Sequence, residues 1–312
     1  MRQNLTESIK NLYERILAYN GEHGDAVEIL RDESMCRHTT FKIGGPAALF
    51  LTPDSVQSMT DLCGMIRETG AKHFFLGNGS NVLFDDGGFD GAVISLAGLN
   101  RVNVTGNAVE AQSGASMASV CKAAREASLT GLEFAFGIPG TVGGAVYMNA
   151  GAYGGETAFV LAQSTYLDLD TLTVHTIPLA DHGFGYRESV YKHTSRLILS
   201  AEFALTEGNR EEIAALMADY MNRRVTKQPL EYPSAGSVFK RYPGRYTGQM
   251  IDESGLKGYT IGGAQVSEKH AGFIINKGGA TAKDVLDLIA YIKKVIFDNY
   301  GCELECEVIH VN

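Results

Sequence analysis

Three glycine-rich segments contain the residues best suited to cradle a phosphate group. They are residues 41–47 (FKIGGPA), 76–83 (LGNGSNVL) and 137–154 (GIPGTVGGAVYMNAGAYG). Because glycine lacks a Cβ, its backbone amide can approach an anion closely, and Ser80 and Asn81 add small polar donors at the same place. A single segment of this kind is more typical of a tight turn, but three of them together favour a phosphate cradle.

The spacing within these segments excludes the two most familiar phosphate-binding loops. Gly77 and Gly79 supply the first two glycines of a G-x-G-x-x-G fingerprint, but Val82 stands where the third is needed. The chain also contains no G-x-x-x-x-G-K-[ST] motif. The sequence therefore predicts a phosphate site outside the Rossmann and Walker-A folds.

Glu307 is the acidic residue with the most informative surroundings. In a terminal strand predicted over 303–311, alternation places Glu305, Glu307, Ile309 and Val311 on one face. That face becomes apolar towards its end, so Glu307 is expected where a polar edge meets buried core. A carboxylate there could share a proton or hold another carboxylate. The alternative is a solvated strand end.

Hydrophobic periodicity and turn signals predict an α+β protein whose elements must position these residues. Helices are predicted over 6–20, 55–69, 116–128, 210–225 and 281–299. Strands are predicted over 73–76, 92–96, 108–112, 164–170, 197–205 and 303–311. The expected domains are a helical segment (1–30), a cofactor domain (31–204) and a C-terminal substrate domain (205–312).

Composition narrows the function classes. The net charge of −9, without a basic block, argues against a nucleic-acid partner. No apolar run approaches the roughly 20 residues that span a bilayer, and the polar start is no signal peptide, so we expect no membrane insertion. The five scattered cysteines indicate free thiols in a reducing, cytoplasmic compartment. Cys302 and Cys306 have no nearby histidine pair, so no metal site is expected.

The glycine segments are followed, in order, by YRES (186–189), PSAGSVFKR (233–241), QMIDESGLKG (249–258), IGGAQVSEKHAGFIIN (261–276) and LECEV (304–308). This ordered set resembles the MurB family of UDP-N-acetylenolpyruvoylglucosamine reductases, which act in peptidoglycan precursor synthesis. The resemblance covers roughly residues 35–310. It implies non-covalent FAD in a vanillyl-alcohol-oxidase-like (PCMH-type) domain, followed by a smaller α+β domain for the sugar nucleotide. It also implies that His38 does not link the flavin covalently and is either structural or a hydrogen-bond donor to a residue that contacts the flavin.

The reaction implied by the resemblance is reduction of the enolpyruvyl sugar nucleotide to UDP-N-acetylmuramate, with NADPH as co-substrate. Arg187 matches the family arginine that holds the developing negative charge, and its planar donor fork suits a carboxylate. From the sequence alone, a surface ion pair with Glu188 explains Arg187 more simply. Ser237 matches the family's proton donor, although a serine beside a glycine is otherwise typical of a turn. Glu307 matches the family's catalytic glutamate, with Cys306 in place of the usual preceding proline.

The resemblance also carries over a set of binding residues. Those expected to bind FAD are Gly44, Gly45, Leu76, Gly77, Asn78, Gly79, Ser80, Asn81, Val82, Gly137, Pro139, Gly140, Thr141, Val142, Gly143, Gly144, Ala145, Asn149 and Gly151. Those expected to contact substrate are Tyr153, Tyr186, Lys227, Lys240, Arg241 and Gln265. Lys240 and Arg241 would also supply positive charge near Ser237.

Arg241 fits a compact branch of the family that lacks a tyrosine-bearing substrate loop. The chain between Leu205 and Lys227 is also too short and too helical for that insertion. A monomer is favoured.

Two other interpretations of the function stay open: a PCMH-type oxidase acting on an alcohol or hydroxy acid, and a non-enzymatic regulator that binds a flavin or a sugar nucleotide. The joint presence of Arg187, Ser237 and Glu307 argues against both.

Overall fold

The protein is described here by a computed structural model covering residues 5–312, so residues 1–4 of the expected N-terminal segment lie outside the described chain. By compactness the chain divides into two units. Unit 1 comprises the described residues up to Arg31, Leu49–Asn78 and Gly91–Arg223. Unit 2 comprises Asp32–Ala48, Gly79–Asp90 and Arg224–Asn312.

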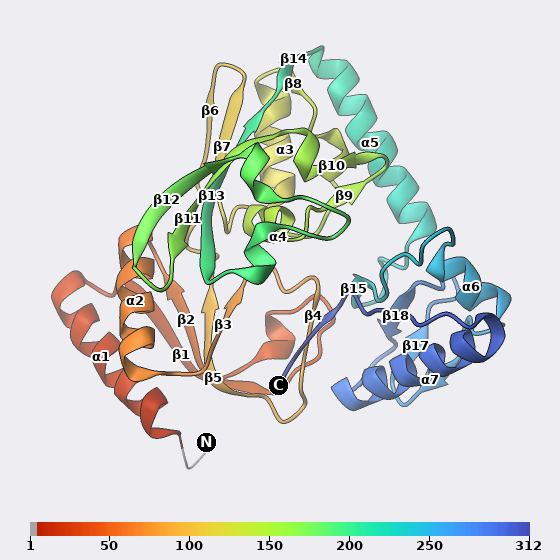
Figure 1. The fold of residues 1–312 in the computed structure, drawn as a ribbon, viewed down its shortest axis with the longest axis horizontal. Coiled ribbons are helices and arrows are strands. Elements are labelled where there is room, and N and C mark those ends of the chain that lie inside the picture. The colour runs from red at the N-terminus through yellow and green to blue at the C-terminus, as the bar shows by residue number, and fades with distance from the viewer. Residues whose placement is uncertain (1–4) are drawn as a thin grey trace. The chain divides into compact units, whose positions relative to one another are not determined.

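Helices and strands are interspersed along the chain, with several strands following one another directly (Figure 1). The helices are α1 (Glu7–His23), α2 (Val56–Thr69), α3 (Met117–Glu126), α4 (Val142–Tyr147), α5 (Arg210–Lys227), α6 (Thr247–Glu253) and α7 (Ala282–Tyr300). The strands are β1 (Val27–Ser34), β2 (Pro46–Pro53), β3 (His73–Leu76), β4 (Val82–Phe84), β5 (Phe89–Ser95), β6 (Val102–Thr105), β7 (Ala108–Gln112), β8 (Leu129–Thr130), β9 (Gly151–Ala152), β10 (Gly155–Glu156), β11 (Leu161–Asp168), β12 (Thr173–Pro178), β13 (Arg196–Ala204), β14 (Thr206–Glu207), β15 (Ser234–Ser237), β16 (Thr260–Ile261), β17 (Ala264–Val266), β18 (Phe273–Asn276) and β19 (Ile309–Val311).

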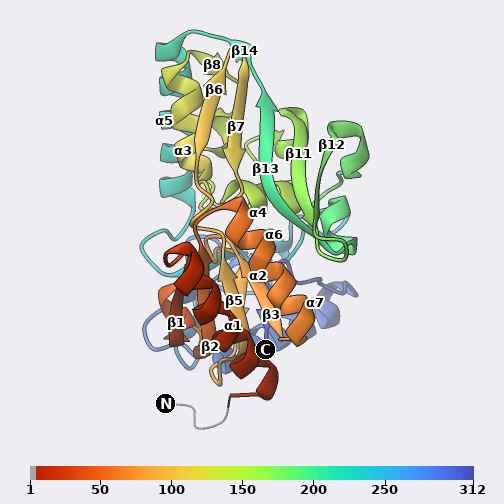
Figure 2. The same cartoon turned by 90° about the vertical axis from the view of Figure 1, so that its left-hand side faces the viewer.

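Unit 1 contains a five-stranded sheet in the order β12-β11-β13-β7-β6, in which every neighbouring pair is antiparallel. Helix α3 packs against β6 and β7, and α4 packs against β13 (Figure 2). Val109, Val120, Val142 and Phe203 belong to the buried core between them. This core includes residues of β11 and α4, and α4 carries the candidate cofactor residues 142–145.

A second sheet has the order β1-β2-β5-β3, with β3 parallel to β5. Three of its strands, β1, β2 and β5, each begin in one unit and end in the other. Helices α1 and α2 pack on one another. Helix α2 begins with a capping box between Ser55 and Ser58 and ends at Gly70, whose φ of 63° is left-handed.

Unit 2 is built on an antiparallel sheet in the order β15-β18-β17-β16. Helix α7 packs against β16 and β17, and α6 packs against α7 (Figure 1). Val238, Ile274, Leu288 and Ile292 lie in the buried core of this unit. Strands β4 and β19 form a separate parallel pair, joining residues 82–84 to residues 309–311.

Most predicted helices are confirmed to within a few residues, because their caps are local. The helix predicted over 281–299 runs from Ala282 to Tyr300, with the expected capping box between Thr281 and Asp284. The helix predicted over 6–20 continues through Gly21 to His23 and ends at Gly24, whose φ is 72°. Leu17 lies on the solvent side of that helix and is 47% exposed.

The strand predicted over 303–311 is wrong for most of its length, because β19 covers only Ile309–Val311. Upstream, the chain follows residues 238–240 through single backbone contacts, including a bridge between Phe239 and Cys306. The compact units also differ from the contiguous domains expected from the sequence. They divide α5 between Arg223 and Arg224, whereas the predicted boundary was near residue 205.

Candidate active site

Within unit 1, parts of two glycine-rich segments lie side by side although about 60 residues separate them. The Asn78 side chain donates a hydrogen bond to the carbonyl of Pro139 at 2.5 Å. A Cβ added to Gly77 would lie 2.6 Å from Thr141 Oγ1, so glycine is required for this approach. The structure thus brings together residues that sequence analysis assigned separately to cofactor binding.

This juxtaposition leaves backbone donors available. Within residues 5–312, the amides of Asn78, Gly140 and Thr141 donate to no acceptor of the chain. Gly140 and Thr141 are consecutive, and successive amides of this kind form anion-binding concavities. Asn78, Pro139 and Gly144 are exposed, which leaves this part of the surface accessible. A phosphate fits the chemistry of this donor set.

Other glycines of the three segments are required by contacts with protein. A Cβ at Gly79 would lie 2.1 Å from the His38 carbonyl oxygen, and one at Gly45 would lie 2.1 Å from that of Asp86. A Cβ at Gly143 would lie 3.0 Å from the Ser113 Cβ. From the sequence, the glycines of these segments are expected to let the backbone approach a phosphate group. For Gly45, Gly79 and Gly143, the close approach is instead to other parts of the protein.

Asn149 follows α4 and is almost fully buried, and its side chain makes two contacts with protein. Its Nδ2 donates to the Gly185 carbonyl at 3.0 Å, and its Oδ1 accepts from the Ala158 amide at 3.0 Å. Asn149 therefore connects the third glycine-rich segment to the segment that carries Arg187. Farther along the third glycine-rich segment, Tyr153 stacks on Tyr220 with ring centroids 4.7 Å apart.

Arg187 lies at the tip of a two-residue turn. Gly185 and Glu188 exchange backbone hydrogen bonds of 3.2 Å, which leaves Tyr186 and Arg187 as the two central residues. Arg187 has a left-handed φ of 56°, a conformation that costs a non-glycine residue about 1–3 kcal/mol. Its guanidinium stacks on the half-exposed Tyr186 ring at 5.1 Å. A strained arginine where glycine would be preferred points to a role for its side chain.

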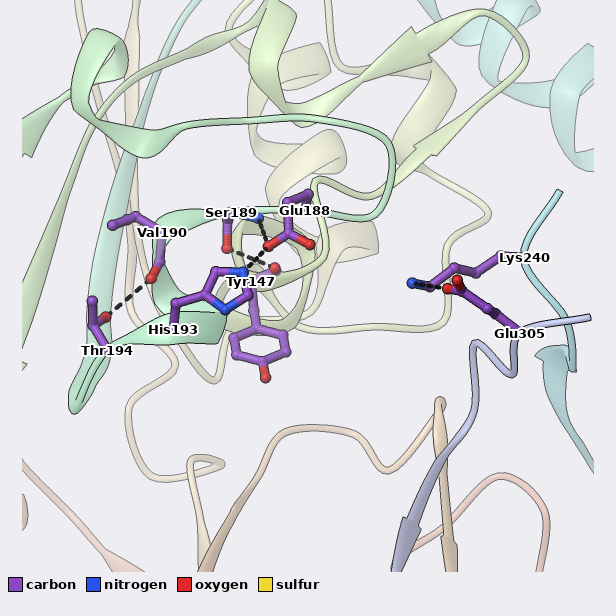
Figure 3. A network of polar contacts seen from close by, with 8 residues as sticks. All are labelled: Tyr147, Glu188, Ser189, Val190, His193, Thr194, Lys240 and Glu305. Carbon is purple, nitrogen blue, oxygen red and sulfur yellow. Dashed lines mark hydrogen bonds and ion pairs between the residues drawn. The ribbon is translucent and has the colours of Figure 1, made fainter. Parts of the chain in front are cut away.

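Polar contacts hold the base of this turn (Figure 3). Ser189 Oγ donates to the Tyr147 carbonyl at 2.7 Å, and Glu188 Oε1 lies 2.8 Å from His193 Nε2. Burial raises the pKa of Tyr147, and the nearby Glu188 raises it further. The Glu188 carboxylate thus has contacts with His193 and with the Ser189 amide, at 3.2 Å.

In unit 2, the structure brings the backbones around Ser237 and Glu307 together. Ser237 ends β15, where Gly236 has a left-handed φ of 75° and the pairing with β18 is irregular. The Glu307 amide donates to the Val238 carbonyl at 2.7 Å, so the two candidates belong to adjacent, hydrogen-bonded segments. Both residues are partly exposed.

The remaining candidate cations differ in their surroundings. Lys240 forms an ion pair of 2.8 Å with Glu305 (Figure 3), a contact that was not expected from the sequence. The Lys240 ammonium lowers the pKa of Glu305. The signal in the sequence that could have found Glu305 was its position on the same predicted strand face as Glu307. Arg241 stacks on the Tyr246 ring at 5.5 Å. Lys227 is exposed at the end of α5.

Two other predicted contacts are local. Gln265 Nε2 donates to the Gly258 carbonyl at 3.2 Å and to Thr260 Oγ1 at 3.0 Å, so its amide nitrogen holds a turn. His38 Nε2 lies 2.9 Å from Glu33 Oε1. All five cysteines are free thiols. No group of three or more potential metal ligands occurs in residues 5–312, and no helix there is long and apolar enough to cross a membrane.

Two family models match the chain. The FAD binding domain model matches residues 47–177, and the model of the C-terminal domain of UDP-N-acetylenolpyruvoylglucosamine reductase matches residues 228–311. A PCMH-type FAD-binding domain joined to a smaller α+β domain defines a class of flavin-dependent oxidoreductase, and the mixed sheets and helices of this chain are those of that class.

Full-length relatives specify the family. The chain is 46% identical over 298 residues to UDP-N-acetylenolpyruvoylglucosamine reductase of Clostridium perfringens, covering 96% of this chain and 98% of the relative. Reductase 2 of Bacillus cereus is 46% identical over 280 residues, covering 90% and 92%. The crystal structure of MurB from Thermus caldophilus superposes with a TM-score of 0.77 at 34% identity, covering 92% and 99%. The chain belongs to the UDP-N-acetylenolpyruvoylglucosamine reductase family.

Proposed function

We propose that this reductase uses Arg187, Ser237 and Glu307 to convert its enolpyruvyl sugar nucleotide to UDP-N-acetylmuramate in peptidoglycan precursor synthesis. When bound, FAD accepts a hydride from NADPH and supplies it to the methylene carbon of the substrate. The chain must then bind the substrate carboxylate, stabilise the negative charge that develops on it, and deliver a proton to the adjacent carbon.

The residues present fit a non-covalently held FAD. Asn78, Gly140 and Thr141 offer unused backbone amides beside one another in unit 1, and this donor set suits a diphosphate. We assign these three residues and the exposed Gly144 as direct ligands. Gly45, Gly79 and Gly143 support the same segments through their packing against protein.

We assign Arg187 to the substrate carboxylate. Its turn is closed by the Gly185–Glu188 backbone pair and is tethered by the bond from Asn149 to Gly185. A guanidinium held in advance interacts more strongly with an enolate-like charge than with the ground state, because the charge grows while the donors stay in place. Tyr186, stacked on the guanidinium, is assigned to the substrate pocket.

We assign Ser237 as the proton donor and Glu307 as the carboxylate that works with it. The observation that carries this proposal is the bond from the Glu307 amide to the Val238 carbonyl, which holds the two segments side by side. Lys240 lies on the same segment as Ser237 and can favour ionisation of a nearby hydroxyl, although Glu305 partly neutralises it.

Stopped-flow absorbance of the two half-reactions tests the assignment of Ser237. Ser237→Ala should slow flavin reoxidation by substrate by about 10²–10⁴-fold, the usual contribution of general acid catalysis. Flavin reduction by NADPH should stay near normal. Ser234→Ala, in the same strand, is the matched control and should leave both steps unchanged. Reoxidation of the Ser237→Ala enzyme at the wild-type rate would remove Ser237 from the mechanism.

Further assignments complete the proposal. Tyr153, Lys227, Lys240, Arg241 and Gln265 are assigned to the substrate pocket, and Gly44, Leu76, Gly77, Ser80, Val82, Gly137, Pro139, Val142, Ala145 and Gly151 to the surroundings of FAD. We propose a cytoplasmic monomer that acts on small molecules, the UDP-sugar and NADPH. We also propose that it belongs to the compact branch, since α5 occupies residues 210–227. The folding domains are proposed as 1–30, 31–204 and 205–312.

A further inference from the structure

A buried hydrogen-bonded group adjoins the Arg187 turn in unit 1 and has no part in the chemistry described above. Ser164, in the central part of β11, lies with its Oγ 2.6 Å from His182 Nε2 and 2.6 Å from Tyr191 Oη. Ser164, His182 and Tyr191 are at most 3% exposed. The His182 ring precedes the Arg187 turn in the chain, and the Tyr191 ring follows it.

The direction of this hydrogen-bond chain can be assigned from its partners. His182 Nδ1 lies 2.9 Å from the Pro178 carbonyl, which can only accept, so Nδ1 carries the proton. Burial lowers the pKa of His182, which favours a neutral ring whose Nε2 is an acceptor. Tyr191 Oη therefore donates to Ser164 Oγ, and Ser164 Oγ donates to His182 Nε2. All three side chains are satisfied in one arrangement.

A Ser–His pair at this distance also resembles a nucleophile with its base. Burial excludes that use, since Ser164 is 1% exposed and His182 0% exposed, so a substrate cannot reach the hydroxyl. The partner of Nδ1 is a backbone carbonyl and not a carboxylate. The arrangement fixes two side chains to one strand.

The two fixed rings bracket the segment that carries Arg187. His182 belongs to the short helix Leu179–His182 and stacks on Phe184 with centroids 4.9 Å apart. Tyr191 belongs to the short helix Val190–His193. Because both side chains bond to the same hydroxyl of β11, the ends of the segment 183–190 are held to the five-stranded sheet.

We infer that Tyr191, Ser164 and His182 form a clamp that positions Arg187 by fixing both ends of its turn to β11. The inference rests on the proposed role of Arg187. The turn holds a left-handed arginine, a conformation that a loosely tethered segment would relax. The three clamp residues are positioning residues, since they are buried away from any ligand and act through Arg187.

The first test measures the turn itself by hydrogen–deuterium exchange of the protein. Tyr191→Phe removes one hydroxyl and keeps the ring, so we expect faster exchange in peptides covering residues 183–190. Thr165→Ala is the matched control, because it removes a hydroxyl from the next residue of β11, where Thr165 bonds the exposed Thr176. Exchange unchanged by Tyr191→Phe would overturn the clamp. Ser164→Ala, which removes the central hydroxyl, gives the same test should Tyr191→Phe fold poorly.

The second test is a double-mutant cycle on the substrate half-reaction. Tyr191→Phe should slow this step by about 10- to 100-fold, the scale expected for misplacing a group by about 1 Å, and leave flavin reduction unchanged. In an Arg187→Ala background it should have no further effect, because the clamp acts through Arg187. Equal slowing in both backgrounds would overturn the inference. If Arg187→Ala alone does not slow the step, the proposed function fails instead, and the exchange measurement still decides whether the clamp exists.

Discussion

Asn81 holds the backbone of Glu307: its Nδ2 donates to the Glu307 carbonyl at 3.0 Å, and its own carbonyl accepts from the Ile309 amide at 3.0 Å. The two residues are 226 positions apart in the chain. The second glycine-rich segment, expected from the sequence to bind the cofactor, thus also holds the backbone of the candidate glutamate. In this way the proposed cofactor segment and the candidate catalytic glutamate share one hydrogen-bonded element of unit 2.

Asn81→Ala should therefore affect Glu307 more than FAD. Loss of this bond should lower the free energy of unfolding by about 1 kcal/mol, slow the substrate half-reaction, and leave FAD affinity within a few-fold of wild type. Flavin fluorescence titration measures the affinity, and stopped-flow absorbance measures the step. Loss of FAD with a normal substrate step in the residual holoenzyme would make Asn81 a direct cofactor ligand instead.

Gly143 and Gly144 are adjacent, yet they should respond differently to alanine. A Cβ at Gly143 meets Ser113 at 3.0 Å, so Gly143→Ala should lower the free energy of unfolding. A Cβ at the exposed Gly144 meets only Thr141 Oγ1, at 3.6 Å. Gly144→Ala should raise the stability of the apoprotein by about 0.5–1 kcal/mol, as alanine does within a helix, while weakening FAD binding.

Denaturant titration of both apoproteins, together with FAD titration, checks this pair. Equal destabilisation by the two substitutions would contradict the packing argument. Wild-type FAD affinity in Gly144→Ala would remove Gly144 from the cofactor site.

Arg187→Gly should separate stability from activity. Glycine adopts the φ of 56° without strain, so this variant should be about 1 kcal/mol more stable than Arg187→Ala. Both variants should reoxidise with substrate about 10²–10³-fold more slowly than wild type, since both lack the guanidinium. Thermal unfolding and single-turnover kinetics provide the two readouts. A glycine variant that is less stable than the alanine variant would show that the turn is not strained at this residue.

Stability should fall on acidification because a partly buried histidine is held in its neutral form. His270 Nδ1 accepts the Gly272 amide at 3.1 Å, and burial lowers the pKa of His270 from its ordinary 6.5. The unfolded chain then binds more protons than the folded chain in this range. The contribution of His270 is complete above about pH 6.5 and is lost as the pH falls towards the lower folded pKa.

Comparison of His270→Gln with wild type isolates this contribution. The loss of unfolding free energy between about pH 7.5 and about pH 5.5 should be smaller in His270→Gln than in wild type. His175→Gln, at an exposed position of β12, should keep the wild-type dependence. An identical pH dependence in His270→Gln and wild type would exclude the mechanism.

Local features and ordered motifs could be predicted from the sequence alone. Helix ends such as Ser55 and Thr281 were predictable because a cap depends on residues within one turn. The motifs around Arg187, Ser237 and Glu307 pointed to the reductase family because their order along the chain is specific, and the full-length relatives confirm that family.

Which residues meet across long separations depends on the fold and could not be predicted from the sequence. The bonds from Asn78 to Pro139, from Asn81 to Glu307 and from Ser164 to both His182 and Tyr191 join residues with no periodic relation in the chain. The terminal strand was overestimated for the same reason: alternation was present, but residues 303–306 lack a continuous partner strand. Backbone pairing and close packing depend on which segments the fold brings together, and a single segment does not encode its neighbour.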